Sequence, residues 1–265
     1  MAFSLADIKT KATLKPPRIL IHGKPGVGKT TIASEFPEPL FLMTEDGLGV
    51  IDVAHTDLLK NYDDIVEILK SLLAEDHKYK TLVIDSLDHL EPIIFDKTCK
   101  VEGFKDINEP GYGKGFSLSL KYTREIIDLL NQLREQKGMI ICMLAHSVIK
   151  RFEDPTSEAY DRYEIKLNAK HGFLYLEVSD IVGFADFKTG TVVEKSRGGE
   201  RTRAVSTGQR VLHVEERPAF LAKNRYSLPA ELPLKWDAIK DAITPGGNDE
   251  DTIDLSKAKT EFEPE

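Results

Sequence analysis

The sequence predicts an α/β fold in which a mainly parallel sheet is flanked by helices and is followed by antiparallel strands. Apolar strand segments alternate with amphipathic helical segments between residues 18 and 145, which is the pattern of a parallel sheet covered on both faces. Residues 23–30 read GKPGVGKT, a complete G-x-x-x-x-G-K-[ST] loop that directly follows the apolar segment RILIH. After about residue 180, short alternating runs separated by glycine predict antiparallel strands at one edge of the sheet.

Each predicted element has its own local signal. The helix after the loop runs to about Phe36, because Pro37 and Pro39 cannot continue it. The second helix carries isoleucine and leucine at i, i+3 and i+4 spacing, and the third ends before Gly138. The predicted strands are residues 18–22, 40–43, 81–84, 139–145, 190–195 and 210–215, and the predicted helices are residues 29–36, 63–73 and 123–136. One domain, residues 18–245, holds all of them.

The glycine-rich loop predicts a nucleoside triphosphate as ligand. Without Cβ atoms, glycines let backbone N–H groups converge on phosphate oxygens, and the start of the helix adds a partial positive charge there. Lys29 is expected to reach the β- and γ-phosphates, and the Thr30 hydroxyl is expected to help hold Mg²⁺. The residues expected to bind ATP are Gly23, Lys24, Pro25, Gly26, Val27, Gly28, Lys29, Thr30 and Thr31.

Polar residues follow three further predicted strands, at the edge where ligands bind in open α/β sheets. Asp85 ends the strand TLVI in the position of a Walker B aspartate, where it would hold Mg²⁺ through water; an aspartate there is also a common helix cap. Glu45 is the predicted base that orients the attacking water, with Asp46 as second choice and an ordinary turn acid as the alternative. His146 either senses the γ-phosphate through a hydrogen bond or caps its strand.

Lys223 and Arg225 are two residues apart in the segment LAKNRYSLP, so on a strand they point to the same face. Two cations that project together from an edge suit the γ-phosphate of a nucleotide bound by a neighbouring subunit. An arginine supplied in this way stabilises charge in the transition state and is worth about 10³–10⁵ in rate. The alternative is a solvated basic edge that prevents aggregation.

Together, the glycine-rich loop, Glu45, the pair Asp85-Ser86, the strand tipped by His146 and the late KNR segment resemble the RecA-like ATPases. The KNR segment is similar to the KNRFG element of the bacterial RadA branch and to the K-x-R finger of DnaB-type helicases, but the final Phe and Gly are not matched. Small size, with no separate DNA-binding domain before the loop, most resembles the phage-encoded RecA-core proteins of single-strand annealing and recombination. The resemblance covers about residues 15–230 and implies a RecA-like P-loop NTPase fold.

The resemblance also implies where DNA would bind. In that family two loops, after the Walker B strand and after the next strand, line a central DNA channel, and they match residues 99–117 and 148–171 here. The first contains the run GYGKG, whose lysine would meet phosphate and whose tyrosine would stack on a base. The second has five basic and five acidic side chains, which equally fits an ordinary mobile loop. The candidate DNA-binding residues are Tyr112, Lys114, Lys150, Arg151, Phe152 and Arg162.

The composition argues against several classes of protein. The longest apolar run in the 265 residues, Met139–Ala145, is far too short to span a bilayer. The N-terminus carries no charged-then-apolar segment with a small-residue cleavage site. Cys99 and Cys142 are the only cysteines, and Cys142 lies in an apolar strand, so a disulfide framework is not expected. A cytoplasmic protein without membrane partners fits these observations, in the host cytoplasm if the protein is phage-encoded.

Charge is distributed unevenly along the chain. The formal net charge is −8, of which residues 246–265 carry −5, whereas residues 188–225 carry a local +5. The terminal segment is polar and poor in aromatic residues, which predicts a disordered acidic tail. Such a tail keeps the protein soluble, competes as a polyanion for a basic groove, or binds a partner. Residues 1–17 are predicted to form an extended arm that ends at two prolines.

Two functions fit these features. The first is an ATPase of DNA recombination that forms a ring or filament on single-stranded DNA, promotes annealing or strand pairing, hydrolyses ATP under DNA stimulation and works beside a single-stranded DNA-binding protein. The second is a RecA-like ATPase that acts on protein partners as a regulator or assembly factor, which the net acidity and the neutral second loop favour. A small-molecule kinase is less favoured, because residues 99–117 contain no arginine to form a lid over the phosphates.

Overall fold

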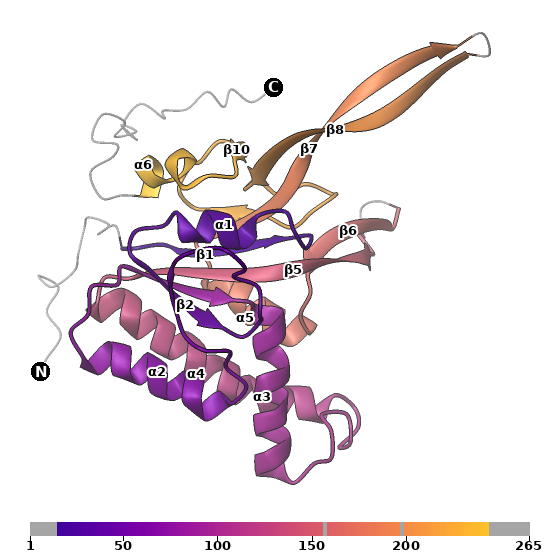
Figure 1. Ribbon diagram of the computed structural model, residues 1–265. Helices are drawn as coiled ribbons and strands as arrows, with labels where there is room; N and C mark the ends of the chain where they lie inside the picture. Colours follow the sequence, from indigo (N-terminus) through magenta and orange to yellow (C-terminus); the bar gives the residue numbers. More distant parts are fainter. Residues whose placement is uncertain (1–14, 156–157, 197–198, 244–265) are drawn as a thin grey trace, which may run out of the picture.

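The strand that precedes the phosphate loop lies in the middle of a mixed sheet (Figure 1). The computed structural model describes residues 15–155, 158–196 and 199–243. Within them the strand order is β10-β8-β7-β1-β5-β4-β2-β3, with β6 paired to β5 and β9 paired to β7. The strands are β1 (Arg18–Gly23), β2 (Pro39–Met43), β3 (Ala54–His55), β4 (Thr81–Asp85), β5 (Ile140–Phe152), β6 (Tyr160–Ile165), β7 (Ile181–Ser196), β8 (Gly199–His213), β9 (Lys223–Asn224) and β10 (Glu231–Pro233).

The pairing directions confirm the predicted α/β class. Strands β3, β2, β4, β5, β1 and β7 pair in parallel, whereas the pairs that involve β6, β8, β9 and β10 are antiparallel. Strands β8, β9 and β10 all follow residue 198 and are antiparallel additions beside β7, as the sequence predicts, whereas the antiparallel strand β6 pairs with β5. This is the sheet expected of a P-loop NTPase.

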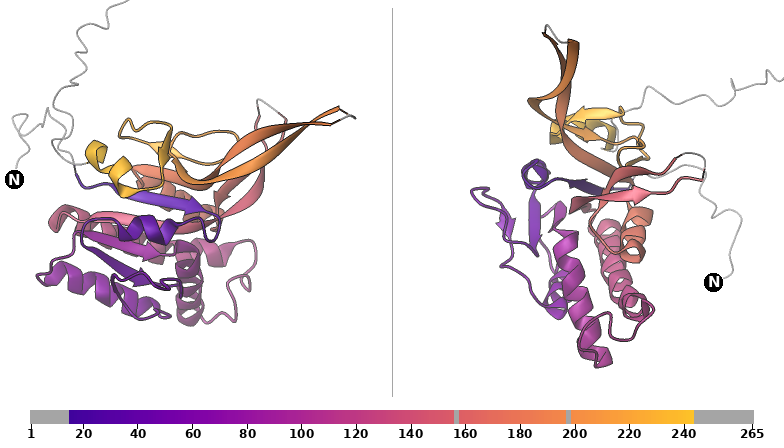
Figure 2. Two further views of the ribbon diagram at one scale, coloured as in Figure 1. Left: turned by 45° about the horizontal axis from the view of Figure 1, so that its top comes forward. Right: turned by 90° about the vertical axis from the view of Figure 1, so that its right-hand side faces the viewer.

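Helices cover both faces of the sheet (Figure 2). Helices α2 to α5 pack on one face, and α1 and α6 pack on the other. Strand β1 serves both cores, because Leu20 faces the first while Ile19 and Ile21 face the second. Among the described residues, no helix is long and apolar enough to cross a membrane. The helices are α1 (Lys29–Ser34), α2 (Tyr62–Ala74), α3 (Leu87–Glu102), α4 (Lys114–Gln136), α5 (Ala169–Val178) and α6 (Lys240–Ile243), with a short 3-10 helix at Trp236–Ala238.

The segment predicted as a first loop, residues 99–117, is shorter than expected. Helix α3 continues to Glu102, and α4 begins at Lys114, nine residues before the predicted start of that helix. Gly115 is buried within α4, where a Cβ atom would lie 2.0 Å from the carbonyl oxygen of Ile107. This glycine therefore permits close packing of the α3–α4 connection on the helix, and does not act as a flexible loop residue.

The segment predicted as a second loop, residues 148–171, is instead largely ordered into a hairpin. Strand β5 runs on to Phe152 and pairs in antiparallel register with β6. Strands β7 and β8 likewise continue as a two-stranded arm that projects from the body of the molecule (Figures 1 and 2). Residues 1–14 of the predicted arm and the whole of the predicted acidic tail lie outside the described residues.

A buried carboxylate fixes the amino end of the central strands. Asp180, just before β7, accepts hydrogen bonds from the backbone and guanidinium of Arg18 at 3.0–3.2 Å, from Arg134 at 3.4 Å and from Arg225 at 3.3 Å. Burial by itself raises the pKa of Asp180, but the hydrogen bonds and charges of Arg18 and Arg134 outweigh it and hold that pKa below its ordinary value.

We expect Asp180→Ala to lower the free energy of unfolding by about 3 kcal/mol at neutral pH, because it leaves two largely buried guanidinium groups without their carboxylate. Urea unfolding would measure the difference, with the exposed Asp52→Ala as control. Since the pKa is lowered in the fold, the stabilisation is present above the ordinary aspartate pKa and is lost as the pH falls through the folded value. Equal urea midpoints for Asp180→Ala and wild type at neutral pH would contradict this.

Candidate functional site

Strands β1, β4 and β2 end at the same edge of the sheet, whereas β5, which lies between β1 and β4, continues past this edge to Phe152. Gly23 at the end of β1 pairs with His146 in β5, and Met43 at the end of β2 pairs with Asp85 at the end of β4. The backbone N–H of Glu45 donates to the carbonyl of Asp85 at 3.1 Å, which holds the residue after β2 beside β4. These contacts gather the predicted residues around one cavity of about 280 Å³, lined by Pro25, Gly26, Gly28, Lys29, Thr30, Thr31, Glu45, Gly47, Ile51, Asp85, His146 and Arg210.

The loop backbone has the conformation that its glycines allow. Gly28, the residue before α1, has φ of 105°, and Gly26 has φ of 74°, both in the region that favours glycine. The ammonium of Lys29 lies inside the loop and donates to the carbonyls of Gly23 and Lys24, each at 3.2 Å. Burial lowers the pKa of Lys29, while the negative charges of nearby carboxylates oppose that shift. The loop thus surrounds the buried ammonium of Lys29, and two of its carbonyl groups accept hydrogen bonds from it.

Three of the predicted loop residues do not line this cavity. Gly23 ends β1, and a Cβ there would lie 2.5 Å from the carbonyl oxygen of Ala185. Lys24 points toward Asp186, 3.7 Å away, and Val27 is buried in the core with α1. Gly23, Lys24 and Val27 therefore contribute to the site through the conformation of the loop, and the side chains of Lys24 and Val27 do not face the cavity.

Thr30 and Asp85 meet where the metal ion is expected. The Thr30 hydroxyl donates to Oδ2 of Asp85 at 2.8 Å, across a gap of 55 residues in the chain. Burial raises the pKa of Asp85, and the hydrogen bond from Thr30 opposes the shift. A hydroxyl and a carboxylate are hard oxygen donors of the kind that Mg²⁺ binds directly or through water, so the pair fits a magnesium nucleotide.

Glu45 belongs to a cluster of hydrogen-bonding side chains. Ser86 Oγ donates to Oε2 of Glu45 at 3.0 Å and lies 2.9 Å from Nδ1 of His89. Nδ1 of His89 is also 3.1 Å from Glu45 Oε2. Glu45, His89 and His146 present three potential ligand atoms within 4.8 Å of one another, a set that suits a transition-metal ion better than Mg²⁺. Within the fold, these contacts hold Glu45 at the mouth of the phosphate cavity.

The carboxylate of Asp88 contacts both the backbone and the ring of His146. One carboxylate oxygen accepts the backbone N–H of His146 and the other lies 2.9 Å from its Nδ1, while only 1% of the Asp88 side chain is exposed. Burial by itself raises the pKa of Asp88, but the hydrogen bonds and charge of His146 outweigh it and hold the pKa well below its ordinary value. An ionised Asp88 places the ring proton on Nδ1 and leaves Nε2 of His146 to face away from it. No pattern in the sequence predicts this pairing.

Arg210, in β8, is a second residue that the sequence analysis missed. One guanidinium nitrogen lies so close to Gly28 that a Cβ on that glycine would be 2.7 Å from it. Among the described residues, this guanidinium has neither a hydrogen bond nor a salt bridge, and its Cζ lies over the Phe187 ring, 6.0 Å from the centroid. A single chain thus places a cation over its own phosphate loop.

A comparison with protein families agrees with this geometry. A family model described as AAA domain matches residues 15–226, which is well over half of the chain. The chain belongs to the AAA domain family. It is accordingly a P-loop ATPase, with the nucleotide-binding fold that the loop at residues 23–30 indicates. No curated protein matches the chain.

In this AAA domain protein, Lys223 and Arg225 lie far from the phosphate loop of their own chain. Strand β9 pairs with the first residues of β7, at the amino end of the sheet. The Lys223 ammonium donates to the carbonyls of Leu176 and Glu177 at the end of α5, and Arg225 contacts Asp180. The Arg225 side chain is about half exposed.

The predicted DNA-binding residues of this ATPase divide into two groups. Tyr112 is fully exposed, and Lys114 and Arg151 are exposed as well. Lys150 instead donates to the carbonyl of Leu167. Phe152 packs against Tyr160 and under the guanidinium of Arg162, which is only 5% exposed and is bound to Glu216 at 2.8 Å. Lys150 and Arg162 are thus engaged within the chain.

We expect Asp88→Asn to lower kcat for ATP hydrolysis about 10- to 100-fold with KM little changed. An amide presents only one acceptor oxygen to the two N–H groups of His146, so the ring loses its orientation, whereas Asp88 does not line the phosphate cavity. Steady-state kinetics would measure the split between kcat and KM. Asp96→Asn, at an exposed position of the same helix, is the control; a wild-type kcat for folded Asp88→Asn would refute the positioning role.

Proposed function

We propose that this P-loop ATPase is a RecA-like protein of DNA recombination, which oligomerises on single-stranded DNA and promotes annealing or strand pairing in the cytoplasm. ATP hydrolysis with Mg²⁺ would use Lys29, Thr30 and Asp85 for the triphosphate, Glu45 for the attacking water and His146 for the γ-phosphate. Family membership supports the ATPase part, and the recombination part rests on the features described next.

The position of the KNR segment is the observation that carries the assembly part of the proposal. The phosphate loop stands at the carboxyl end of β1, whereas Lys223 and Arg225 stand beside the amino end of β7, which is parallel to β1. If copies stack head to tail, the amino edge of one faces the carboxyl edge of the next. Arg225 would then reach the neighbour's γ-phosphate, and hydrolysis would depend on assembly.

Exposed residues on two connections support the DNA part. Tyr112 and Lys114 lie at the α3–α4 connection, and Arg151 lies on the β5–β6 hairpin. In Figure 1 the β5–β6 hairpin stands on the right-hand side, beside the sheet, and the α3–α4 connection lies at the lower right, at the far end of α3. An exposed tyrosine that stacks on a base, with cations for phosphate, is the combination used to bind single strands without sequence preference.

A second function is favoured by the engaged state of Lys150 and Arg162. With both residues bound to groups of their own chain, the β5–β6 hairpin offers few cations to a polyanion. An ATPase that acts on protein partners, as a regulator or assembly factor, has no need of such cations. Binding to nucleic acid therefore discriminates between the two functions.

We expect Lys29→Ala and Arg225→Ala each to abolish ATPase activity, Arg225→Ala by about 10³-fold or more, and their mixture to recover part of it. In the mixture, an intact phosphate loop from one variant meets an intact arginine from the other, which ATPase assays at several mixing ratios would detect. Because Arg225 contacts Asp180, Arg225→Gln and a urea unfolding curve guard against loss of the fold. Normal hydrolysis by Arg225→Ala would show that the arginine is not a finger.

We expect wild type to bind a labelled single-stranded oligonucleotide in the presence of ATP, with an affinity that falls steeply as salt rises. Lys114→Ala should weaken binding and reduce the slope of log K against log salt by about 1, since one phosphate contact is lost. Lys70→Ala, an exposed lysine on α2, is the matched control and should leave the slope unchanged. Absent or salt-independent binding would contradict the recombination role and favour protein partners.

A further inference from the structure

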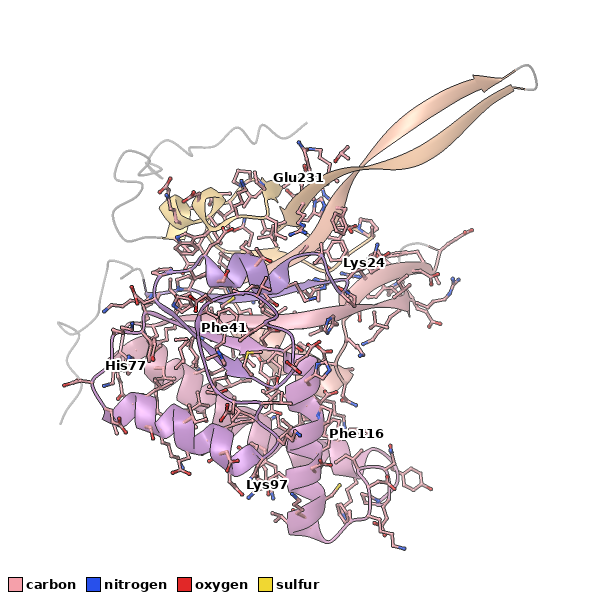
Figure 3. The ribbon with its side chains drawn as sticks, in the orientation of Figure 1. Lys24, Phe41, His77, Lys97, Phe116 and Glu231 are labelled. Carbon is pink, nitrogen blue, oxygen red and sulfur yellow. The ribbon has the colours of Figure 1, made fainter. Side chains whose placement is uncertain are left out.

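A second, larger hollow lies directly beside the phosphate cavity. It encloses about 580 Å³ between the exposed side of α1 and the base of β8, β10 and the segment that follows them. Figure 3 shows Glu231 of β10 above α1, while Lys24 lies beside the start of the phosphate loop. Its lining is formed by Thr31, Glu35, Lys188, Gly208, Gln209, Arg210, Val211, Glu231, Leu232, Pro233, Leu234 and Lys235.

The two hollows share two residues, Thr31 and Arg210. The far end of the phosphate cavity holds Glu45, Asp85 and His146, so that end takes the γ-phosphate and the metal ion. A triphosphate that begins there and follows the first turn of α1 has its α-phosphate beside Thr31 and Arg210. Whatever is attached to the α-phosphate must then continue past these two residues.

We propose that the nucleoside of the bound triphosphate lies in this second hollow, with Arg210 at the junction between phosphates and nucleoside. The inference rests on the nucleotide binding of the proposed function and names the part of the chain that receives the base and the sugar. It assigns to β8 and β10, at the antiparallel edge of the sheet, a role in nucleotide affinity.

The chemistry of the lining suits a nucleoside. Val211, Leu232 and Leu234 are buried apolar residues at the hollow, and they offer a surface for the faces of a base. The rim is polar, since the Lys188 ammonium binds Glu231 at 2.7 Å and Glu35 accepts the backbone N–H of Trp236 at 2.9 Å. Polar rim groups suit the edges of a base and the hydroxyls of the sugar.

Arg210 has the position and the freedom needed at the junction. Its guanidinium lies against Gly28, where no Cβ stands in the way, and forms no ion pair with any described residue. A free, planar cation at this point can bind an α-phosphate oxygen with one edge and stack its face on a base. No carboxylate has to be displaced before it does so.

Photolabelling of the wild-type chain with 8-azido-ATP and Mg²⁺ tests the placement directly. We expect the label on peptides that contain residues 207–211 or 231–235, and we expect excess ATP to prevent the labelling. Label confined to peptides outside this hollow, such as residues 47–53 or 146–152, would overturn the placement without affecting the proposed ATPase function.

Calorimetric binding of ATP and of inorganic tripolyphosphate supplies an independent test that separates the nucleoside from the phosphates. Pro233→Trp, at an exposed position of the lining, should weaken ATP binding about tenfold or more and leave tripolyphosphate binding unchanged. Arg210→Ala should weaken ATP binding about tenfold as well. Pro218→Trp, an exposed proline outside the hollow, is the matched control.

The outcomes distinguish the two levels of inference. Equal affinity of wild type for ATP and tripolyphosphate, or an ATP affinity that Pro233→Trp leaves unchanged, would overturn the nucleoside placement alone. Failure of wild type to bind either ligand would overturn the placement together with the proposed function.

Discussion

Strand β1 hydrogen-bonds to β5 on one side and to β7 on the other, and the position of every group in the site depends on that register. The pairing of Gly23 with His146 puts the histidine beside the start of the loop. The pairing of β5 with β4 in turn places Asp85, at the end of β4, at the same edge of the sheet. His22 locks this register, because its buried ring contacts Ser147 Oγ at 2.9 Å and the carbonyl of Leu221 at 2.8 Å. Burial lowers the pKa of His22 to about 4, so the ring is neutral near pH 7.

The charges around the loop suit a nucleotide that arrives with a metal ion. Lys29 is buried among Asp85, Asp88 and Glu45, and all three negative charges act on its pKa. A triphosphate entering this group of carboxylates meets repulsion that one ammonium does not cancel, and a divalent ion held by Thr30 and Asp85 would offset that repulsion. Because burial raises the pKa of Asp85, acidification protonates this carboxylate more readily than an exposed one, and metal binding there would weaken with it.

Local patterns predicted the parts of the site that lie in or next to their own strand, and failed for parts that only the tertiary fold joins. The loop and the residues Glu45 and Asp85 follow from the rule that parallel strands end at one edge. His146 reaches the same edge, but the prediction that it ends its strand is wrong, because β5 continues to Phe152 in a hairpin with β6. Arg210 stands 182 residues after Gly28, and no local pattern reports that their atoms meet. Local patterns did not predict helix α3, because Pro92 lies inside it and proline disfavours the interior of a helix. Gly115 was assigned to a loop because a glycine needed for close packing cannot be told from a loop glycine in the sequence. Its missing Cβ makes room for the carbonyl oxygen of Ile107.

The length of β1 decides which arginine can serve which nucleotide. Arg18 at its amino end is bound with Arg225 to the same Asp180, and Gly23 at its carboxyl end opens the phosphate loop. Five residue steps of extended chain span about 17 Å, which is longer than an extended arginine side chain. Arg225 therefore cannot reach the phosphates of its own chain, and any catalytic role it has requires a second copy. Arg210, in contrast, lines the phosphate cavity of its own chain. The two proposals taken together therefore divide the work: Arg210 would contribute to nucleotide affinity within a single chain, while Arg225 would contribute to the rate of hydrolysis only in an assembly.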